Sequence, residues 1–220
     1  MKYQNVCRAF FLDRPNRFIA HVDLDGKVET VHVKNTGRCK ELLVHGAEVF
    51  LTAPGTSGRK TTYDLIAVRK SGGILFNIDS QAANKAAQEW LEKQPFERLI
   101  PEFSYGSSRI DFYMERENKK YLMEVKGCTL EVDGIGYFPD APTERGVKHI
   151  HELISAVRNG YQGILAYVIQ MDGVKIVRPN LAMHPEFGRA LSEAEAEGVR
   201  ILYLPCHVEP DELFITAEPM

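Results

Sequence analysis

The stretch SRIDFYMERENKKYLMEVKG, residues 108–127, decides the fold that we expect for this chain. Apolar and polar side chains alternate along it with the period of two that a β-strand requires. A polar break at Glu117-Asn118 interrupts the alternation, so we predict two strands joined by a tight hairpin turn. The apolar set falls on one face of this hairpin and consists of Ile110, Phe112, Met114, Tyr121, Met123 and Val125.

The other face of the hairpin carries the charged side chains that could bind a metal ion. In the register set by that turn, Asp111 faces Glu124 and Arg109 faces Lys126. An aspartate directly opposite a glutamate is a repulsive pair, and a bound divalent cation relieves the repulsion most simply. Mg²⁺ or Mn²⁺ suits such a site, because hard cations take carboxylate oxygens, waters and substrate phosphate as ligands.

A nuclease-type role is one interpretation of these groups. Asp111 and Glu124 would hold the cation, and Glu102 offers a third acidic metal ligand just upstream. Lys126 would position the attacking water or stabilise the phosphate oxygens. The Gly-Ser-Ser segment at 106–108 would let the backbone approach a phosphate. The alternative is a solvated lattice of ion pairs on an exposed sheet face, which surface charges usually form.

A helix is expected downstream of the hairpin. The segment FPDAPTERGVKHIHEL runs from a Pro-rich loop into a helical pattern with an apolar packing stripe. Arg145 and His149 share the opposite, polar stripe, which faces either the site or solvent. If it faces the site, Arg145 would clamp a phosphate bidentately, and His149 or Lys148 would help to orient it.

The first part of the chain reads as short strands separated by turn residues. Asp25-Gly26 is a strong hairpin signal, and Asn35 or Thr36 would cap a brief helix that carries Leu42 and Leu43 inward. The expected strands cover 18–24, 27–33, 47–53, 62–69 and 74–79. Five or so strands with one small helix indicate an OB-like barrel, a fold that often holds nucleic acid.

From Gln81 the period becomes helical, so we place a domain boundary there and expect an OB-like domain over 1–80 and a second domain over 81–220. Strands alternate with helices in the second part, which predicts an α/β domain with a mixed sheet. The expected helices cover 81–94, 146–159 and a segment around 185–198, and the expected strands cover 108–115, 119–127, 163–170, 174–179 and 199–205.

Charge and composition narrow the class of protein. Residues 1–80 hold 12 Lys and Arg against 8 Asp and Glu; the whole chain holds 27 and 30, which leaves 15 against 22 for residues 81–220. A phosphate-binding surface is therefore expected on the first part. The four cysteines lack paired spacing, so neither a zinc site nor a disulfide framework is indicated. No apolar run has the length of a signal peptide or a membrane span, so we expect a cytoplasmic protein with no membrane partner.

Several segments together resemble the sugar fermentation stimulation protein A (SfsA) family. They are NTGRCKELL, RKTTYDL, SRIDF, EVKGCTL and FPDAPTERGVKHIHEL, and the similarity spans nearly the whole chain. The resemblance implies an OB-like domain followed by a domain of the PD-(D/E)xK nuclease fold, binding to DNA, and a link to the regulation of sugar utilisation, notably of maltose.

Carried onto this sequence, the family's nuclease pattern falls on Asp111, Glu124 and Lys126, with Glu102 as the upstream carboxylate. Ile110 stands where the superfamily has its proline. The resemblance also makes a set of basic residues candidates for contact with phosphate. These are Arg38, Lys40, Arg59 and Lys60. Arg109 of the hairpin is a further candidate for contact with nucleic acid.

Two functions stay open. One is an Mg²⁺-dependent nuclease that acts on nucleic acid, with DNA preferred to RNA as the partner. The other is a DNA-binding regulator that keeps a nuclease-like fold without catalysis, because fold alone never proves activity. A third hypothesis gives the barrel an oligosaccharide, which OB folds can bind. Nothing in the sequence selects an oligomeric state.

Overall fold

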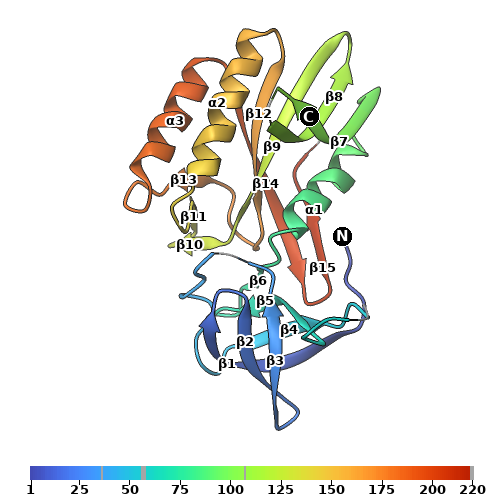
Figure 1. Ribbon diagram of the computed structural model, residues 1–220, viewed down its shortest axis with the longest axis vertical. Coiled ribbons are helices and arrows are strands. Elements are labelled where there is room, and N and C mark those ends of the chain that lie inside the picture. Colours follow the sequence, from blue (N-terminus) through green and yellow to red (C-terminus); the bar gives the residue numbers. More distant parts are fainter. Residues whose placement is uncertain (36, 56–57, 107, 219–220) are drawn as a thin grey trace.

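The computed structural model describes residues 1–35, 37–55, 58–106 and 108–218. It has two parts stacked along the long axis of the molecule (Figure 1). A barrel, coloured blue to cyan, forms one end, and an α/β domain that contains the helices forms the other. Thr36, one of the two residues expected to cap a short helix, lies outside the described residues.

Five strands close the barrel. Its sheet has the order β3-β2-β1-β4-β5-β6, and an additional parallel pairing of β3 with β5 joins the two ends of the first five. The hairpin predicted at Asp25-Gly26 is confirmed, as are the strands that follow it. The strands are β1 (Val6–Asn16), β2 (Ile19–Leu24), β3 (Lys27–Val33), β4 (Glu48–Thr52), β5 (Asp64–Arg69) and β6 (Leu75–Asn77).

The short helix expected at 35–46 is wrong, because the described residues of this segment form turns. Cys39 has a φ of 45°, outside the helical region, and its carbonyl accepts hydrogen bonds from the amides of both Leu42 and Leu43. Asn35 caps no helix, since its side chain bonds to the Ile78 carbonyl and the Gly37 amide. Leu42 and Leu43 nevertheless point inward as expected, 1% and 9% exposed.

The α/β domain is built on a mixed six-stranded sheet of order β15-β14-β12-β9-β8-β7. β12 runs parallel to both β9 and β14, and the remaining pairs are antiparallel. The sheet strands are β7 (Arg98–Tyr105), β8 (Ser108–Arg116), β9 (Lys119–Cys128), β12 (Gln162–Ile169), β14 (Arg200–Glu209) and β15 (Glu212–Ile215). A small second sheet contains β10 (Leu130–Val132), β11 (Ile135–Phe138) and β13 (Val177–Pro179).

Helices cover both faces of the main sheet. α1 (Ala82–Leu91) packs on one face, and α2 (Glu144–Arg158) and α3 (Pro185–Ala196) lie side by side on the other (Figure 1). The apolar residues of β8 and β9 form the floor under α1, where Phe112, Met114, Met123 and Val125 are buried with its alanines. The α/β class with a mixed sheet, predicted from the alternation of strands and helices, is confirmed.

The central hairpin has the predicted register, with Arg116 opposite Lys119 and Phe112 opposite Met123. Glu117 and Asn118 have φ of 50° and 60°, the left-handed pair that a two-residue type I′ turn requires. The backbone therefore places β8 and β9 as the alternation of their side chains indicated.

Several strands of the structure were not predicted from the sequence. The strands β1, β7, β10, β11 and β15 were not predicted, and the strand expected at 174–179 contracts to β13. Met1 and Tyr3 precede the barrel in the sequence but contact the α/β domain. The Met1 carbonyl accepts from the Leu213 amide of β15, and the Tyr3 amide donates to the Asp211 carbonyl in the β14–β15 turn. No helix among the described residues has the length and apolarity to cross a membrane.

Candidate metal centre

Asp111 lies where the strands around it separate. The β8–β9 ladder ends at Phe112 opposite Met123, one step before Asp111 would meet Glu124. The β7–β8 ladder also passes over Asp111, because Glu102 has a φ of 53° and pairs with nothing there. The backbone of Asp111 therefore pairs with neither β7 nor β9. The sheet has a local break in its pairing at the point where Asp111 approaches Glu124.

The Asp111 carboxylate is held by two donors. Its Oδ2 accepts a hydrogen bond from the Val125 amide at 2.8 Å, and its Oδ1 accepts one from the Asn84 side chain of α1 at 2.7 Å. Burial raises the pKa of Asp111, and the negative charge of Glu124 raises it further. The two carboxylates are therefore close enough to repel each other.

The Glu124 carboxylate is only 3% exposed and is satisfied on one side alone. Its Oε1 accepts from Lys126 Nζ at 2.8 Å and from His149 Nδ1 of α2. Its Oε2 is buried and has no partner among the described residues. Burial works to raise the pKa of Glu124, but the hydrogen bond from His149 and the charge of Lys126 outweigh it and hold that pKa below its usual value.

His149 lies between Glu124 and the exposed Arg145 of α2. Its Nε2 lies 3.2 Å from Arg145 Nε, which donates, so the ring proton resides on Nδ1 and points at Glu124. Both ring nitrogens are thus engaged inside the protein, and the His149 side chain is 8% exposed. The structure places His149 as a support for the Glu124 carboxylate rather than on the surface.

This arrangement fits a hard divalent cation. An unpaired carboxylate oxygen that is buried carries a large desolvation penalty, and a cation would remove it. Asp111 and Glu124 are the residues that would hold the cation, because their mutual repulsion is what the cation would neutralise. Asn84, Lys126 and His149 would fix the two carboxylates in place.

The structure does not bring Glu102 into this group. Its side chain is 71% exposed, and its carboxylate lies 3.4 Å from the guanidinium of Arg109. The Arg109 side chain is itself 68% exposed and also bonds to the Glu102 carbonyl. Glu102 of the edge strand β7 and Arg109 of β8 therefore form an exposed ion pair outside the buried acidic site.

One of the expected phosphate-binding residues on the barrel is held by an ion pair, and the other three are exposed. Arg59 is already bound, since its guanidinium pairs with both oxygens of the buried Asp64. Arg38 and Lys40 are exposed, and among the described residues neither forms an ion pair. Lys60 is exposed in the loop that precedes β5.

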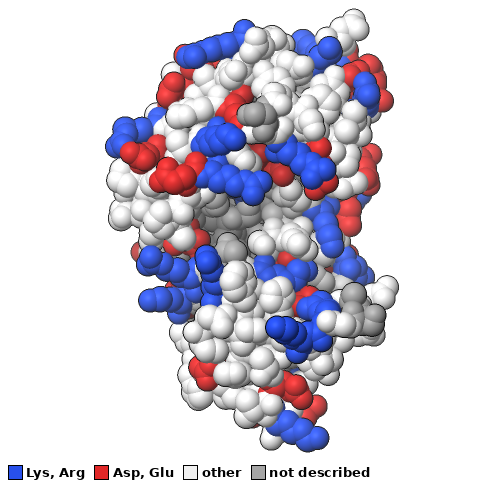
Figure 2. Space-filling model, viewed as in Figure 1, with Lys and Arg blue, Asp and Glu red and all other residues white. Residues whose placement is uncertain are grey.

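Arg38 and Lys40 belong to a groove of about 280 Å³ on the barrel, which we call the basic groove. It is lined by Arg14, Asn16, Arg17, Gly37, Arg38, Lys40 and Leu43. Figure 2 shows the surface hollowed between the barrel and the α/β domain, with Lys and Arg side chains on both borders of the hollow. The positive charge thus faces the junction of the two domains.

A second acidic cluster was not predicted. Glu144, His184 and Glu186 bring their ligand atoms within 4.8 Å of one another at the N-terminal ends of α2 and α3. The Thr143 amide donates to His184 Nδ1 at 3.4 Å, so the neutral ring carries its proton on Nε2 and directs it at the two carboxylates. We interpret this cluster as acids placed favourably at helix N-termini.

Asn84 is the site residue that the sequence analysis missed. It stands among alanines in α1, and its contact with Asp111 depends on how that helix crosses the sheet. An asparagine inside an otherwise strong helical segment is the one local signal, because asparagine is a poor helix former.

Fold and site together define a class: an OB-type barrel joined to an α/β domain with an Asp…Glu-x-Lys set at a sheet opening. A family model described as the SfsA N-terminal OB domain matches residues 12–78. A second, described as the sugar fermentation stimulation protein RE domain, matches residues 81–212. The chain belongs to the sugar fermentation stimulation protein family.

Relatives agree with this assignment. A sugar fermentation stimulation protein homolog of Desulfitobacterium hafniense is 51% identical over 216 residues, which are 97% of this chain and 94% of the relative. A homolog of Ruminiclostridium cellulolyticum is 50% identical over 222 residues, covering 99% and 97%.

A solved structure agrees as well. Described as Pyrococcus furiosus SfsA in complex with Ca²⁺, it superposes with a TM-score of 0.87 and 28% identity, covering all of this chain and 96% of that one. A structure of an EndoMS complex with double-stranded DNA reaches a TM-score of only 0.32 at 12% identity, too low to support an argument. The predicted two-part fold is confirmed.

Proposed function

We propose that this protein is a DNA-binding, metal-dependent nuclease whose site is built on Asp111, Glu124 and Lys126. The observation that carries the proposal is the buried, unpaired Oε2 of Glu124 beside a second carboxylate whose pKa is raised by the Glu124 charge. A folded protein retains such a costly pair where a ligand compensates it. The structure of the Pyrococcus furiosus relative is a complex with Ca²⁺, which supports a hard cation as that ligand.

The chemistry would be hydrolysis of a phosphodiester. A water oxygen forms a bond to phosphorus, the bond from phosphorus to the leaving oxygen breaks, the water releases a proton to solvent and the leaving oxygen takes one up. Asp111 and Glu124 would hold Mg²⁺ or Mn²⁺, which supplies charge neutralisation and a more acidic water. Lys126 would orient the attacking water or stabilise the phosphate oxygens, since its ammonium already lies against Glu124.

The substrate would reach this site along the junction of the domains. Arg38 and Lys40 in the basic groove carry no ion pair among the described residues and are available to phosphate. Arg145, exposed on α2, uses its Nε on His149 and has its remaining guanidinium hydrogens available for a phosphate near Lys126. These contacts carry no base preference of their own.

A second candidate function is a DNA-binding regulator of sugar utilisation without catalysis. One observation favours it: the ion pair between Lys126 and Glu124 partly neutralises the acid without any metal. On that hypothesis the nuclease-like fold serves shape and charge alone, and binding would survive loss of either acid.

Cleavage assays separate the two functions. We expect labelled DNA to be cut in Mg²⁺ or Mn²⁺ and to remain whole in EDTA. Asp111→Ala and Lys126→Ala should each lower the rate by about 10²- to 10³-fold, whereas Glu195→Ala, an exposed acid on α3, should leave it unchanged. DNA that binds in a salt-sensitive way but is never cut would favour the regulator, and a parallel panel of single- and double-stranded RNA tests the preference for DNA.

A further inference from the structure

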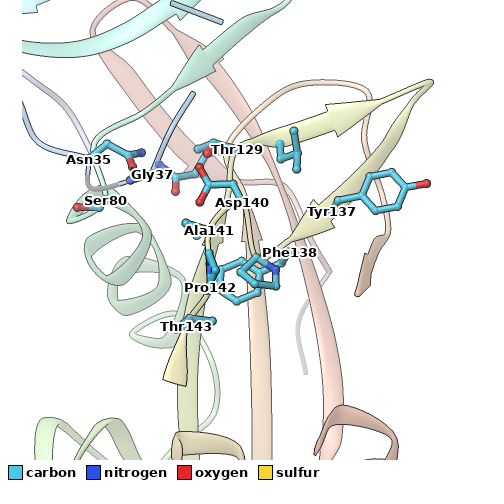
Figure 3. A pocket seen from close by; sticks show the side chains of 14 residues that line it. Asn35, Gly37, Ser80, Thr129, Tyr137, Phe138, Asp140, Ala141, Pro142 and Thr143 are labelled. Carbon is cyan, nitrogen blue, oxygen red and sulfur yellow. Dashed lines mark hydrogen bonds between the residues drawn. The ribbon is translucent and has the colours of Figure 1, made fainter. Parts of the chain in front are cut away.

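A pocket of about 260 Å³ lies between the barrel and the α/β domain. The barrel side contributes Asn35 and Gly37, and the α/β side contributes Gly127, Asp140 and Ala141. Figure 3 shows Asn35, Gly37 and Ser80 on one side of the pocket and Asp140, Ala141 and Pro142 on the other. Gly127, which lines the pocket, is the residue after Lys126 on β9 and belongs to the face of the sheet that α1 covers.

The polar groups of this pocket are fixed before anything binds. The Asn35 amide is held by the Ile78 carbonyl and the Gly37 amide, and one oxygen of Asp140 accepts from the Arg38 amide. Asn35 keeps a second N–H available, and the Asp140 carboxylate, which also receives hydrogen bonds from the backbone of Cys39 and of Asp140 itself, has more lone pairs than these amides use. A ligand with both donors and acceptors along one edge would be satisfied without rearrangement of these side chains.

Part of the remaining wall is apolar, and Ser80, Thr129, Thr143 and Gln170 add further polar groups to it. Phe138, Pro139, Ala141 and Pro142 line the pocket beside the polar groups. The ring of Phe138 is itself held by the rings of Tyr167 and Phe187, at centroid distances of 5.7 and 5.1 Å. Fixed apolar and aromatic walls with a polar edge match the two features of a nucleobase, its flat faces and its hydrogen-bonding edge.

The position of the pocket indicates that its occupant is part of a chain. Gly37 lines both this pocket and the basic groove, so the two are neighbours on the barrel side. On the α/β side, the lining residue Gly127 is separated from Lys126 by a single peptide bond. An occupant therefore has the cations of the basic groove beside it, as one nucleotide in a strand requires.

Resting on the proposed function, we propose that this pocket takes one unstacked base of a bound DNA strand, whose backbone runs from the basic groove to Asp111, Glu124 and Lys126. The volume, below the roughly 300–1,000 Å³ of pockets for drug-sized ligands, suits a single base. Asn35 and Asp140 bond to the edge of the base, and Phe138 and the prolines contact its faces.

The test combines a filled pocket with a missing base. Ala141→Leu places a larger side chain in the pocket, and Ala217→Leu makes the same change in a pocket of about 190 Å³ beside α1 as the matched control. Binding of single-stranded DNA is measured in EDTA, where no cleavage is expected, with one abasic position moved along the strand. Thermal unfolding of both variants checks that the fold is kept.

We expect one abasic position to weaken binding to the wild type and to Ala217→Leu by about tenfold, the size of one base contact. Ala141→Leu should bind the intact strand about tenfold more weakly and be indifferent to that same abasic position. If DNA binds and is cut in metal but no position shows this coupling, the base pocket is wrong and the nuclease proposal stands. If no DNA binds at all, both proposals fall.

Discussion

Asp111 and Glu124 are adjacent carboxylates that the fold treats in opposite ways. Asp111 receives hydrogen bonds from two neutral donors, the Val125 amide and Asn84, and burial raises its pKa. Glu124 is more deeply buried, yet His149 and Lys126 hold its pKa below the usual value. At neutral pH the metal-free site thus contains one carboxylate that the fold favours in its charged form and one that it disfavours.

This asymmetry predicts a stabilising change at Asp111. A group whose folded pKa is raised contributes stability that is complete below its unfolded pKa, about 3.9 for aspartate, and lost as the pH rises through the folded pKa. In EDTA, Asp111→Asn should therefore raise the Tm by about 2 °C at pH 7, with the gain shrinking to nothing near pH 4. Thermal unfolding across this pH range measures it.

The opposite sign is expected at Glu124. A depressed folded pKa contributes stability that is present above the unfolded pKa and lost as the pH falls through the folded one. Glu124→Gln leaves Lys126 and His149 without their anion and should lower the stability by about 3 kcal/mol, with Glu195→Gln as the control. Changes of the same sign at Asp111 and Glu124 would contradict this view of the site.

At the scale of elements, the β8–β9 hairpin was predictable because period two and a two-residue turn fix the register together. Asp111, Glu124 and Lys126 were predicted to share its other face, the one opposite the apolar set. What alternation could not show is which helices meet that face: Asn84 from α1 and His149 from α2 reach the acids through tertiary packing. His149 was accordingly predicted as a contact for nucleic acid, and its ring lies between Arg145 and Glu124.

The segment that follows β3 shows the same limit. Its sequence favours a helix start, but Arg14 of β1, a strand that was not predicted, donates to the carbonyls of Asn35, Gly37 and Arg38. These bonds hold the backbone in an irregular path. The adjacent Phe10 and Phe11 and the nearby Pro15 obscure the alternation of β1, so neither the strand nor its effect was visible in the sequence.

Gly37 makes a direct test of this segment. A Cβ at position 37 would lie 2.2 Å from Asp140 Oδ2 and 2.8 Å from Asn35 Oδ1, so the barrel and the loop before α2 approach closely only because residue 37 is glycine. Gly37→Ala should lower the stability by about 1–3 kcal/mol. Gly37→Ala made in the Asp140→Ala variant should lower the stability by less, and a double-mutant cycle of denaturant unfolding measures the difference. An equal loss of stability in both backgrounds would argue against the contact between residues 37 and 140.

At the scale of the molecule, the two domains are joined by more than the chain between β6 and α1. Gln170, next to β12, donates to Asn77 of β6 and to Asp79, which Lys34 of the barrel also binds. Met1 and Tyr3 bond to the β14–β15 hairpin. These contacts hold the basic groove, the pocket and the candidate metal centre in one fixed arrangement, so that one strand of DNA would span all three.

That arrangement predicts a defined salt dependence. In EDTA, the logarithm of the affinity for single-stranded DNA should fall linearly with the logarithm of salt concentration, by about 0.7 for each cation in contact with phosphate. Arg38→Gln combined with Lys40→Gln should reduce that slope by about 1.4. The control variant combines Lys27→Gln, at the β2–β3 turn, with Lys119→Gln, at the β8–β9 turn. It should leave the slope unchanged. An unchanged slope in both would exclude the basic groove from binding.

Calorimetric titration of the metal-free protein with Mn²⁺ tests most directly whether the two acids share a cation. We predict a single strong site in the wild type, weakened by about tenfold or more in Asp111→Asn, whose fold is expected to be intact. Glu102→Gln, at the exposed ion pair with Arg109, should change the affinity by less than about twofold. Mn²⁺ binding that is equally tight in the wild type and in Asp111→Asn would contradict the account.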